Sequence, residues 1–506
     1  MLTCSNLKIS LQNGRTLVPT FNFSLSHGEK LAIISEEGNG KSTLLKVLCG
    51  IDCDYVKVEG TIYNTETISY LPQSMPSIWN DATPLDFLLK ENIEDEIEDY
   101  NLCIEIDNLC KEMNVDSHFI YSNQCISTLS GGEKVKLQLV KMKMKPASLY
   151  CLDEPTNDLD MNTLIWLEQW IRSTKESIIY ISHDTTLLKN TSTRILHLEQ
   201  RNKKTKPVIT LFSGNYSDYI QQREQSRKKD IQLSSNEKKA YLKQKQKLND
   251  LHNKVQSDLR SVSRQRPHEA KVLKNKMKTI KSSQSHLEQS SYLKLDSYEE
   301  EINIFFDQSH LPKTKEIIEY TNKSIQIEDK TLINPFSLSI YGQDKICITG
   351  NNGCGKSLLV KDMYQQLKNR KDIVLGYMPQ NYSDFFQAHD TPITFLQRFN
   401  FDITSIQSIL GSLKIIENEM NQNIFNCSLG QQAKIYFAYL ILKKSNVLLL
   451  DEPTRNISPL SIPVWIQALN DFEGCIICVS HDRYFIKKVF NTQIIIENNN
   501  LKSQSL

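Results

Sequence analysis

The sequence predicts an α/β protein whose two similar halves are joined by a long antiparallel α-helical hairpin. A short apolar run that ends in two adjacent carboxylates occurs twice, as Leu149–Thr156 and Val447–Thr454. Each copy follows a glycine-rich loop of the kind that binds phosphate. Between the halves lies a polar, basic stretch with helical spacing of its apolar residues. We therefore expect domains at 1–213, 214–303 and 304–506.

Composition and length place the chain among ordinary multidomain globular proteins. Its 506 residues suffice for two to four domains, and its formal net charge is +1. No apolar run approaches the roughly 18 residues that a membrane span requires, and the first ten residues do not form a signal peptide. We therefore expect a cytoplasmic protein that does not cross a membrane.

The twelve cysteines show no metal-ligand spacing. The one CxxC pair, Cys475 and Cys478, lies in the apolar run EGCIICVS, which is typical of a buried strand. A redox or metal role is the alternative, but packing in the core is the expected one.

Residues 35–43, SEEGNGKST, form the first phosphate loop, with Ser35 in place of the usual first glycine. Its glycines allow backbone N–H groups to turn onto phosphates at a helix start. Lys41 is expected to reach the β- and γ-phosphates, and the Ser42 hydroxyl to ligate Mg²⁺. A chance glycine-rich turn is the alternative. The expected nucleotide-binding residues here are Gly38, Asn39, Gly40, Lys41, Ser42 and Thr43.

The acidic strand and its companions complete the chemistry of the first half. Asp153 is expected to hold Mg²⁺ through water, and Glu154 to orient or deprotonate the attacking water. Gln73, at the end of an earlier strand, is a candidate for the Mg²⁺ shell, although an ordinary loop glutamine is the alternative. His183 follows a later strand, where its order after the other motifs favours a γ-phosphate contact over a merely structural histidine.

A fifth motif identifies the kind of domain. Leu129–Glu133, LSGGE, precedes a helix and offers Ser130 and Gly132 to an anion at the helix start. In this order the motifs resemble an ATP-binding-cassette nucleotide-binding domain, of which LSGGE is the signature. The resemblance implies ATP as ligand.

The second half repeats these motifs. Its acids are Asp451 and Glu452, its strand-end glutamine is Gln380, and its histidine is His481. The repeat implies magnesium contacts from Ser357, Gln380 and Asp451, and nucleotide contacts from Gln380. Its phosphate loop and the residue after it are Gly350, Asn351, Asn352, Gly353, Cys354, Gly355, Lys356, Ser357 and Leu358.

The second signature is degenerate, because it reads CSLGQ and keeps only Ser428 and Gly430 of the pattern. Paired cassettes form two composite sites head to tail, each with one half's phosphate loop facing the other half's signature. The site of Lys41 with Ser428 and Gly430 is therefore the less orthodox one. We expect it to turn over differently from the site of Lys356 with Ser130.

The middle stretch is basic and has helical spacing. Residues 221–290 hold about 18 lysines and arginines against about seven aspartates and glutamates. Two apolar stripes predict an antiparallel hairpin with its first helix over about 216–260, Pro267 opening the second, and a tip at about 258–268. The stripes are Leu248, Leu251, Val255 and Leu259, then Leu273, Met277, Ile280 and Leu287.

The charge of this hairpin favours contact with nucleic acid, with a solvated coiled coil as the alternative. The tip contributes Arg260, Arg264 and Arg266. Because no aromatic residues are interleaved, folded RNA fits better than sequence-specific reading of a single strand. DNA is not expected.

Two cassettes, no membrane span and a charged hairpin between them resemble the ABC-F ATPases over essentially the whole chain. The degenerate second signature, the run Glu452–Ser461 and the absence of a long C-terminal extension resemble the antibiotic-resistance (ribosomal protection) branch of the Vga and Lsa type. This resemblance implies a monomer that binds the tRNA exit site of the 70S ribosome when ATP closes it. The basic hairpin would contact 23S rRNA and the P-site tRNA.

The resemblance further implies that the protein dislodges lincosamide, pleuromutilin and streptogramin A antibiotics and leaves on ATP hydrolysis. A housekeeping translation factor of the same family, without a drug phenotype, is the nearest alternative. A transporter ATPase subunit, a DNA-repair protein and a binding module without hydrolysis are alternatives of other classes.

Overall fold

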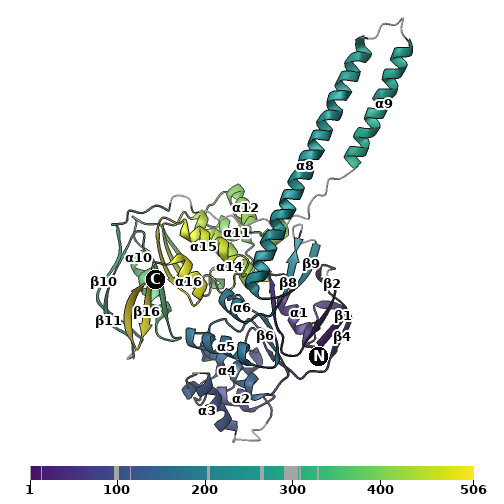
Figure 1. Cartoon of the computed structure of the whole chain (residues 1–506). Helices are drawn as coiled ribbons and strands as arrows, with labels where there is room; N and C mark the ends of the chain where they lie inside the picture. The colour runs from purple at the N-terminus through teal and green to yellow at the C-terminus, as the bar shows by residue number, and fades with distance from the viewer. Residues whose placement is uncertain are drawn as a thin grey trace. The chain divides into compact units, whose positions relative to one another are not determined.

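The protein is described by a computed structural model whose contacts divide it into two units (Figure 1). One unit joins Met1–Tyr216 to Glu301–Leu506, and the other is Ser217–Glu300. The structure describes residues 2–12, 14–95, 102–113, 115–201, 206–261, 267–289, 306, 309–327 and 330–506.

The first half is built on a six-stranded sheet in the order β5-β6-β7-β3-β8-β9. All neighbours are parallel except β8 and β9, which are antiparallel. The central strands are wholly buried apolar runs, as strands covered on both faces must be. The strands are β3 (Lys30–Ser35), β5 (Ile68–Leu71), β6 (Leu149–Asp153), β7 (Ser177–Ile181), β8 (Arg194–Gln200) and β9 (Lys206–Ser213).

Helices cover this sheet, and a second, antiparallel sheet of order β2-β1-β4 adds to the core of the half. The strands are β1 (Leu2–Leu11), β2 (Thr16–Leu25) and β4 (Val56–Asn64). The helices are α1 (Lys41–Leu48), α2 (Pro84–Leu89), α3 (Leu102–Glu112), α4 (Gly131–Met144), α5 (Met161–Ser173) and α6 (Thr185–Thr191).

The second half repeats the plan with the sheet order β13-β14-β15-β12-β16-β17 and a hairpin of β10 and β11. Its strands are β10 (Glu316–Ile327), β11 (Lys330–Tyr341), β12 (Lys345–Gly350), β13 (Leu375–Met378), β14 (Val447–Asp451), β15 (Cys475–Val479), β16 (Thr492–Glu497) and β17 (Asn500–Ser505). Its helices are α10 (Lys356–Leu367), α11 (Pro392–Gln397), α12 (Ile403–Ser412), α13 (Glu417–Met420), α14 (Leu429–Leu442), α15 (Ile462–Asn470) and α16 (Arg483–Val489).

Aromatic packing anchors α14 and α15 to each other in the second half. The rings of Phe437 and Trp465 stack with centroids 3.9 Å apart, and both side chains are fully buried. Cys475 and Cys478 are fully buried in β15, which agrees with the predicted core role.

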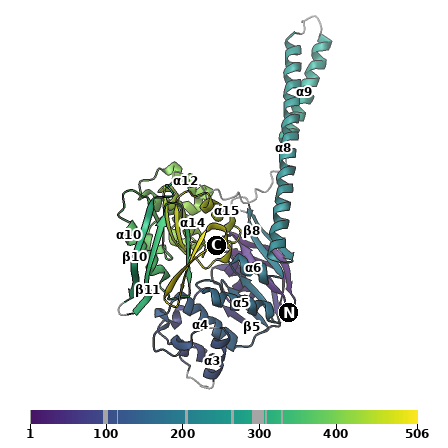
Figure 2. The same cartoon turned by 60° about the vertical axis from the view of Figure 1, so that its left-hand side comes forward.

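The other unit is a helical hairpin of α8 (Tyr216–Ser261) and α9 (Pro267–Gln289), which run side by side in Figures 1 and 2. Gln284 Nε2 donates a hydrogen bond to Asn249 Oδ1 across the pair at 3.1 Å. Leu251 is exposed and His252 is half-buried instead, so the predicted stripe was wrong at that position. Of the predicted tip, Arg264 and Arg266 lie outside the described residues.

Among the residues that the structure describes, no helix has the length and apolar character that crossing a membrane requires.

Candidate active sites

Each phosphate loop ends in a glycine with left-handed backbone, Gly40 (φ 88°) before α1 and Gly355 (φ 98°) before α10. Residues other than glycine rarely adopt this conformation. It aims the N–H groups of the loop toward one point at the helix start. Lys356 Nζ donates to the carbonyls of Gly350 at 2.8 Å and Asn351 at 2.9 Å, and Lys41 Nζ donates to Ser35 O at 3.2 Å. The lysines thus lie over their own loops.

Two cavities bring together phosphate loops and signatures from opposite halves. One has a volume of about 690 Å³, and the other about 370 Å³, both in the range that suits a small molecule. The larger is lined by Gly38, Asn39, Gly40, Lys41, Ser42, Thr43, Gln73, Ser428 and Gly430 among others. The smaller is lined by Asn352, Gly353, Gly355, Lys356, Ser357, Leu358, Gln380, Ser130 and Gly132 among others.

Three residues expected to contact nucleotide, Gly350, Asn351 and Cys354, do not line the smaller cavity. The first two offer their carbonyls to Lys356, as described above. Cys354 packs beside the apolar core of the half, and burial raises the pKa of its thiol. The part of this phosphate loop that lines the cavity is therefore Asn352, Gly353 and the residues from Gly355 onward.

The paired carboxylates follow β6 and β14 as expected. Ser42 Oγ donates to Asp153 Oδ1 at 3.0 Å, so the two predicted magnesium ligands of the first half are adjacent. Burial, and then the neighbouring Glu154, raise the pKa of Asp153 to about 6. Burial also raises the pKa of Asp451, which Ser357 opposes by hydrogen bonding.

The two glutamates differ in their contacts with histidine. Glu154 Oε1 lies 2.8 Å from His183 Nε2, whereas Glu452 Oε1 lies 3.7 Å from His481 Nε2. Burial would raise the pKa of Glu154, but His183 outweighs it and the pKa falls below its usual value. Burial and Asp451 raise the pKa of Glu452 to about 8, and burial and Lys356 lower that of His481 to about 4.

The donor sets fit a nucleotide with a divalent cation. Asn39 lies fully buried at the larger cavity, and both polar atoms of its amide lack a partner among the described residues. A serine hydroxyl beside a carboxylate supplies oxygen ligands of the kind that Mg²⁺ prefers. Phosphate oxygens and water would complete the coordination of such an ion.

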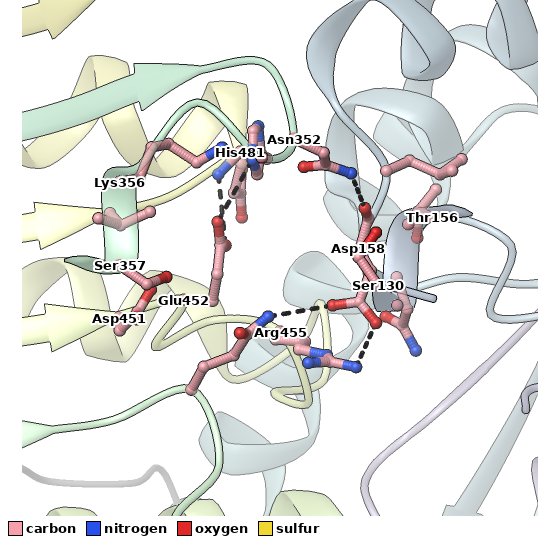
Figure 3. A pocket seen from close by; sticks show the side chains of 18 of the residues that line it. Ser130, Thr156, Asp158, Asn352, Lys356, Ser357, Asp451, Glu452, Arg455 and His481 are labelled. Carbon is pink, nitrogen blue, oxygen red and sulfur yellow. Dashed lines mark hydrogen bonds and ion pairs between the residues drawn. The ribbon is translucent and has the colours of Figure 1, made fainter. Parts of the chain in front are cut away.

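Contacts between the halves centre on Asp158 at the smaller cavity (Figure 3). Its carboxylate accepts from Arg455 at 2.5 Å and from the amide of Gln380 at 3.2 Å. Its carbonyl accepts from Asn352 Nδ2 at 2.6 Å. The sequence analysis did not predict the contact between Asp158 and Arg455. The available signal was Arg455 itself, because the first half has Asn157 at the equivalent position.

The comparisons with known proteins agree with this geometry. The family described as ABC transporter matches residues 18–157 and 333–455. ATP-binding protein Uup of Buchnera aphidicola subsp. Schizaphis graminum is 30% identical over 490 residues, covering 94% of this chain and 77% of that protein. Ribosome protection protein VmlR of Bacillus subtilis is 27% identical over 518 residues, covering 100% of this chain and 88% of that protein.

Other relatives extend the comparison. ABC transporter F family member 2 of Arabidopsis thaliana is 26% identical over 535 residues, covering 96% of this chain and 75% of that protein. The fold resembles the model of ribosome-bound archaeal Pelota and ABCE1, with a TM-score of 0.61 at 15% identity, over 99% of this chain and 78% of that one. The chain therefore belongs to the ABC-F family, and it is an ATP-binding, ATP-hydrolysing enzyme with two tandem cassettes.

Proposed function

We propose that this chain is a ribosome-associated ATPase that acts in translation through its basic hairpin. The observation that carries the proposal is the hairpin itself, on which Lys271, Lys274 and Lys278 of α9 are exposed. A long basic arm without an enclosed core suits the phosphates of folded RNA. The relative named a ribosome protection protein, aligned with the whole of this chain, supports the same partner.

ATP would couple the two cassettes to this arm. A nucleotide on either phosphate loop also meets the signature helix of the opposite half, so ATP favours the closed pairing. The residues that would hold Mg²⁺ are Ser42, Asp153 and Gln73 in one site, with Ser357, Asp451 and Gln380 in the other; the ion would neutralise phosphate charge. Glu154 and Glu452 would then activate water and end the closed state.

The finer proposal is that the closed protein occupies the tRNA exit site and dislodges antibiotics from the peptidyl-transferase centre. The degenerate second signature and the similarity to a ribosome protection protein support it. A housekeeping factor without a drug phenotype is the competing function, and the similarity to Uup is compatible with it.

Ribosome pelleting with the Glu154→Gln/Glu452→Gln variant tests the coarser proposal. We expect co-sedimentation that requires ATP and weakens with salt, and binding to DNA instead of ribosomes would contradict it. Susceptibility of cells that express the wild type tests the finer one. Raised tolerance to lincosamides or pleuromutilins is expected, whereas ribosome binding without tolerance would identify a housekeeping factor.

A further inference from the structure

The two phosphate loops differ at the residue that faces the opposite cassette. Counted from the loop lysine, Glu37 stands where the second loop has Asn352. Asn352 Nδ2 donates to the carbonyl of Asp158. Glu37 Oε1 instead accepts from the backbone N–H of Ser458 at 2.5 Å, in the corresponding loop of the other cassette. Each side chain thus bonds to the backbone of the opposite cassette, Asn352 as donor and Glu37 as acceptor.

A lysine at one helix position has a different partner in each cassette. Lys136 and Lys434 both lie six residues after the signature serine. Lys136 pairs with Asp160 of its own cassette at 2.5 Å. The second cassette has Ser458 in place of that aspartate, and Lys434 reaches across the interface to Glu37 at 2.6 Å.

Two more charged side chains, Glu36 and Lys414, lie beside the Glu37–Lys434 pair. Lys414 Nζ lies 2.7 Å from Glu36, and Lys434 Nζ lies 3.7 Å from the same carboxylate. The side chains of Glu37 and Lys434 are each 4% exposed. Although burial raises the pKa of Glu37, Lys434 outweighs it and keeps that pKa below its usual value.

Glu37 also contacts the second signature at the Lys41 cavity. A Cβ on Gly430 would lie 2.2 Å from Glu37 Cγ, so the glutamate stem lies directly against the second signature. At the Lys356 cavity, Arg455 and Asp158 form an ion pair between the two loops that follow the paired carboxylates. The arginine side chain of this pair is 29% exposed. The Glu37–Lys434 pair is therefore more shielded from water than the Arg455–Asp158 pair, while Lys414 beside it is 19% exposed.

We propose that Glu36 and Glu37, paired with Lys414 and Lys434, make the Lys41 site the long-lived ATP site of the chain. The pairs hold the first phosphate loop against the second cassette while the Lys356 site opens and exchanges nucleotide. The physical reason is kinetic: the buried charges must separate before water can solvate them, and such pairs act mainly on dissociation rates. The proposal depends on the ATPase alone and not on any ribosomal role.

Release of fluorescent mant-ATP from the full-length Glu154→Gln/Glu452→Gln protein, chased with excess ATP, tests this proposal. We expect a slow and a fast phase. Lys41→Ala should remove the slow phase and Lys356→Ala the fast one, which assigns each phase to a site. Lys434→Met should accelerate the slow phase at least about tenfold, because it leaves Glu37 buried without its cation.

Two further variants separate this effect from general damage. Lys136→Met also removes the cation of a buried carboxylate, that of Asp160. Because this pair lies within one cassette, the slow phase should persist. Glu37→Asn combined with Lys434→Met removes the pair without leaving an unpaired charge, so the slow phase should still be lost. The proposal is overturned if the slow phase belongs to the Lys356 site, if Lys136→Met and Lys434→Met act alike, or if the double variant, which lacks the pair, releases as slowly as the parent protein.

Discussion

At the scale of single residues, the two glutamates that end equivalent strands have different electrostatic surroundings. Glu154 lies 2.8 Å from His183, and its pKa is held low, whereas Glu452 is farther from its histidine, and burial and Asp451 raise its pKa. Equivalent sequence positions therefore do not imply equivalent chemistry at the two sites.

The single variants Glu154→Gln and Glu452→Gln should differ in steady-state ATPase activity. If the Lys41 site is long-lived, most turnover passes through Glu452, and its replacement should cost about 100-fold or more. The Glu154→Gln variant should lose less than about tenfold, because its site contributes little to the steady state. Phosphate release under saturating ATP measures both, and equal losses would contradict the difference.

Asp482 gives a pH dependence of stability with a defined sign. Burial, and then Asp184, raise its folded pKa to about 7 from a usual value of 3.8. The unfolded chain therefore loses this proton first, and stability should fall as pH rises between about 4 and 7. Asp482→Asn should remove that part of the fall, since an amide still accepts from the N–H groups of Tyr484 and Phe485. Urea midpoints at pH 5 and pH 8 would show whether the variant gains only at the higher pH.

At the scale of elements, α14 and α15 depend on one aromatic pair. Trp465→Ala should lower the free energy of unfolding by about 3–5 kcal/mol, because it empties a fully buried site stacked on Phe437. Ile403→Ala on α12, at a side chain that is 45% exposed, should change it by less than about 0.5 kcal/mol. Denaturant unfolding of both variants gives the comparison, and similar losses would mean that the stack is unimportant.

The hairpin gives a prediction about salt. Replacing Lys271, Lys274 and Lys278 by Gln should weaken ribosome binding and flatten its dependence on salt. The logarithmic slope should fall by about 0.7–0.9 for each phosphate that the hairpin no longer neutralises. The control is a variant in which three exposed lysines outside the hairpin are replaced by Gln, at Lys57, Lys368 and Lys371. Ribosome-binding curves at several salt concentrations measure this slope for both triple variants. If the hairpin and control variants weaken binding equally, the attraction comes from the total charge of the protein and not from the hairpin.

Much of the hairpin could be predicted because its signals are local. The first helix was expected over about 216–260 and ends at Ser261, and Pro267 opens the second as expected. The error at Leu251 has a physical cause. Because a helix has 3.6 residues per turn, the stripe that starts at Leu248 can continue either three residues later, at Leu251, or four residues later, at His252. Only the partner helix decides between these two positions, and here His252 is the less exposed residue.

At the scale of the whole molecule, the two-cassette fold and the meeting of opposite loops and signatures followed from the order of motifs. The ion pairs across the interface did not. A lysine six residues after a signature serine reads identically in both halves, yet Lys136 binds within its cassette and Lys434 binds across. The choice depends on where a carboxylate stands in three dimensions, which spacing along one chain does not record.

The exchange of lysine partners makes the halves complementary instead of interchangeable. Two copies of the first half would bring Glu36 and Glu37 to a lysine already paired with Asp160, leaving excess negative charge at the interface. Two copies of the second would set Lys434 against Asn352, without the carboxylate of Glu37. Only unlike halves bring Glu37 to Lys434, so a gene that duplicated either half and lost the other would encode a protein without this ion pair.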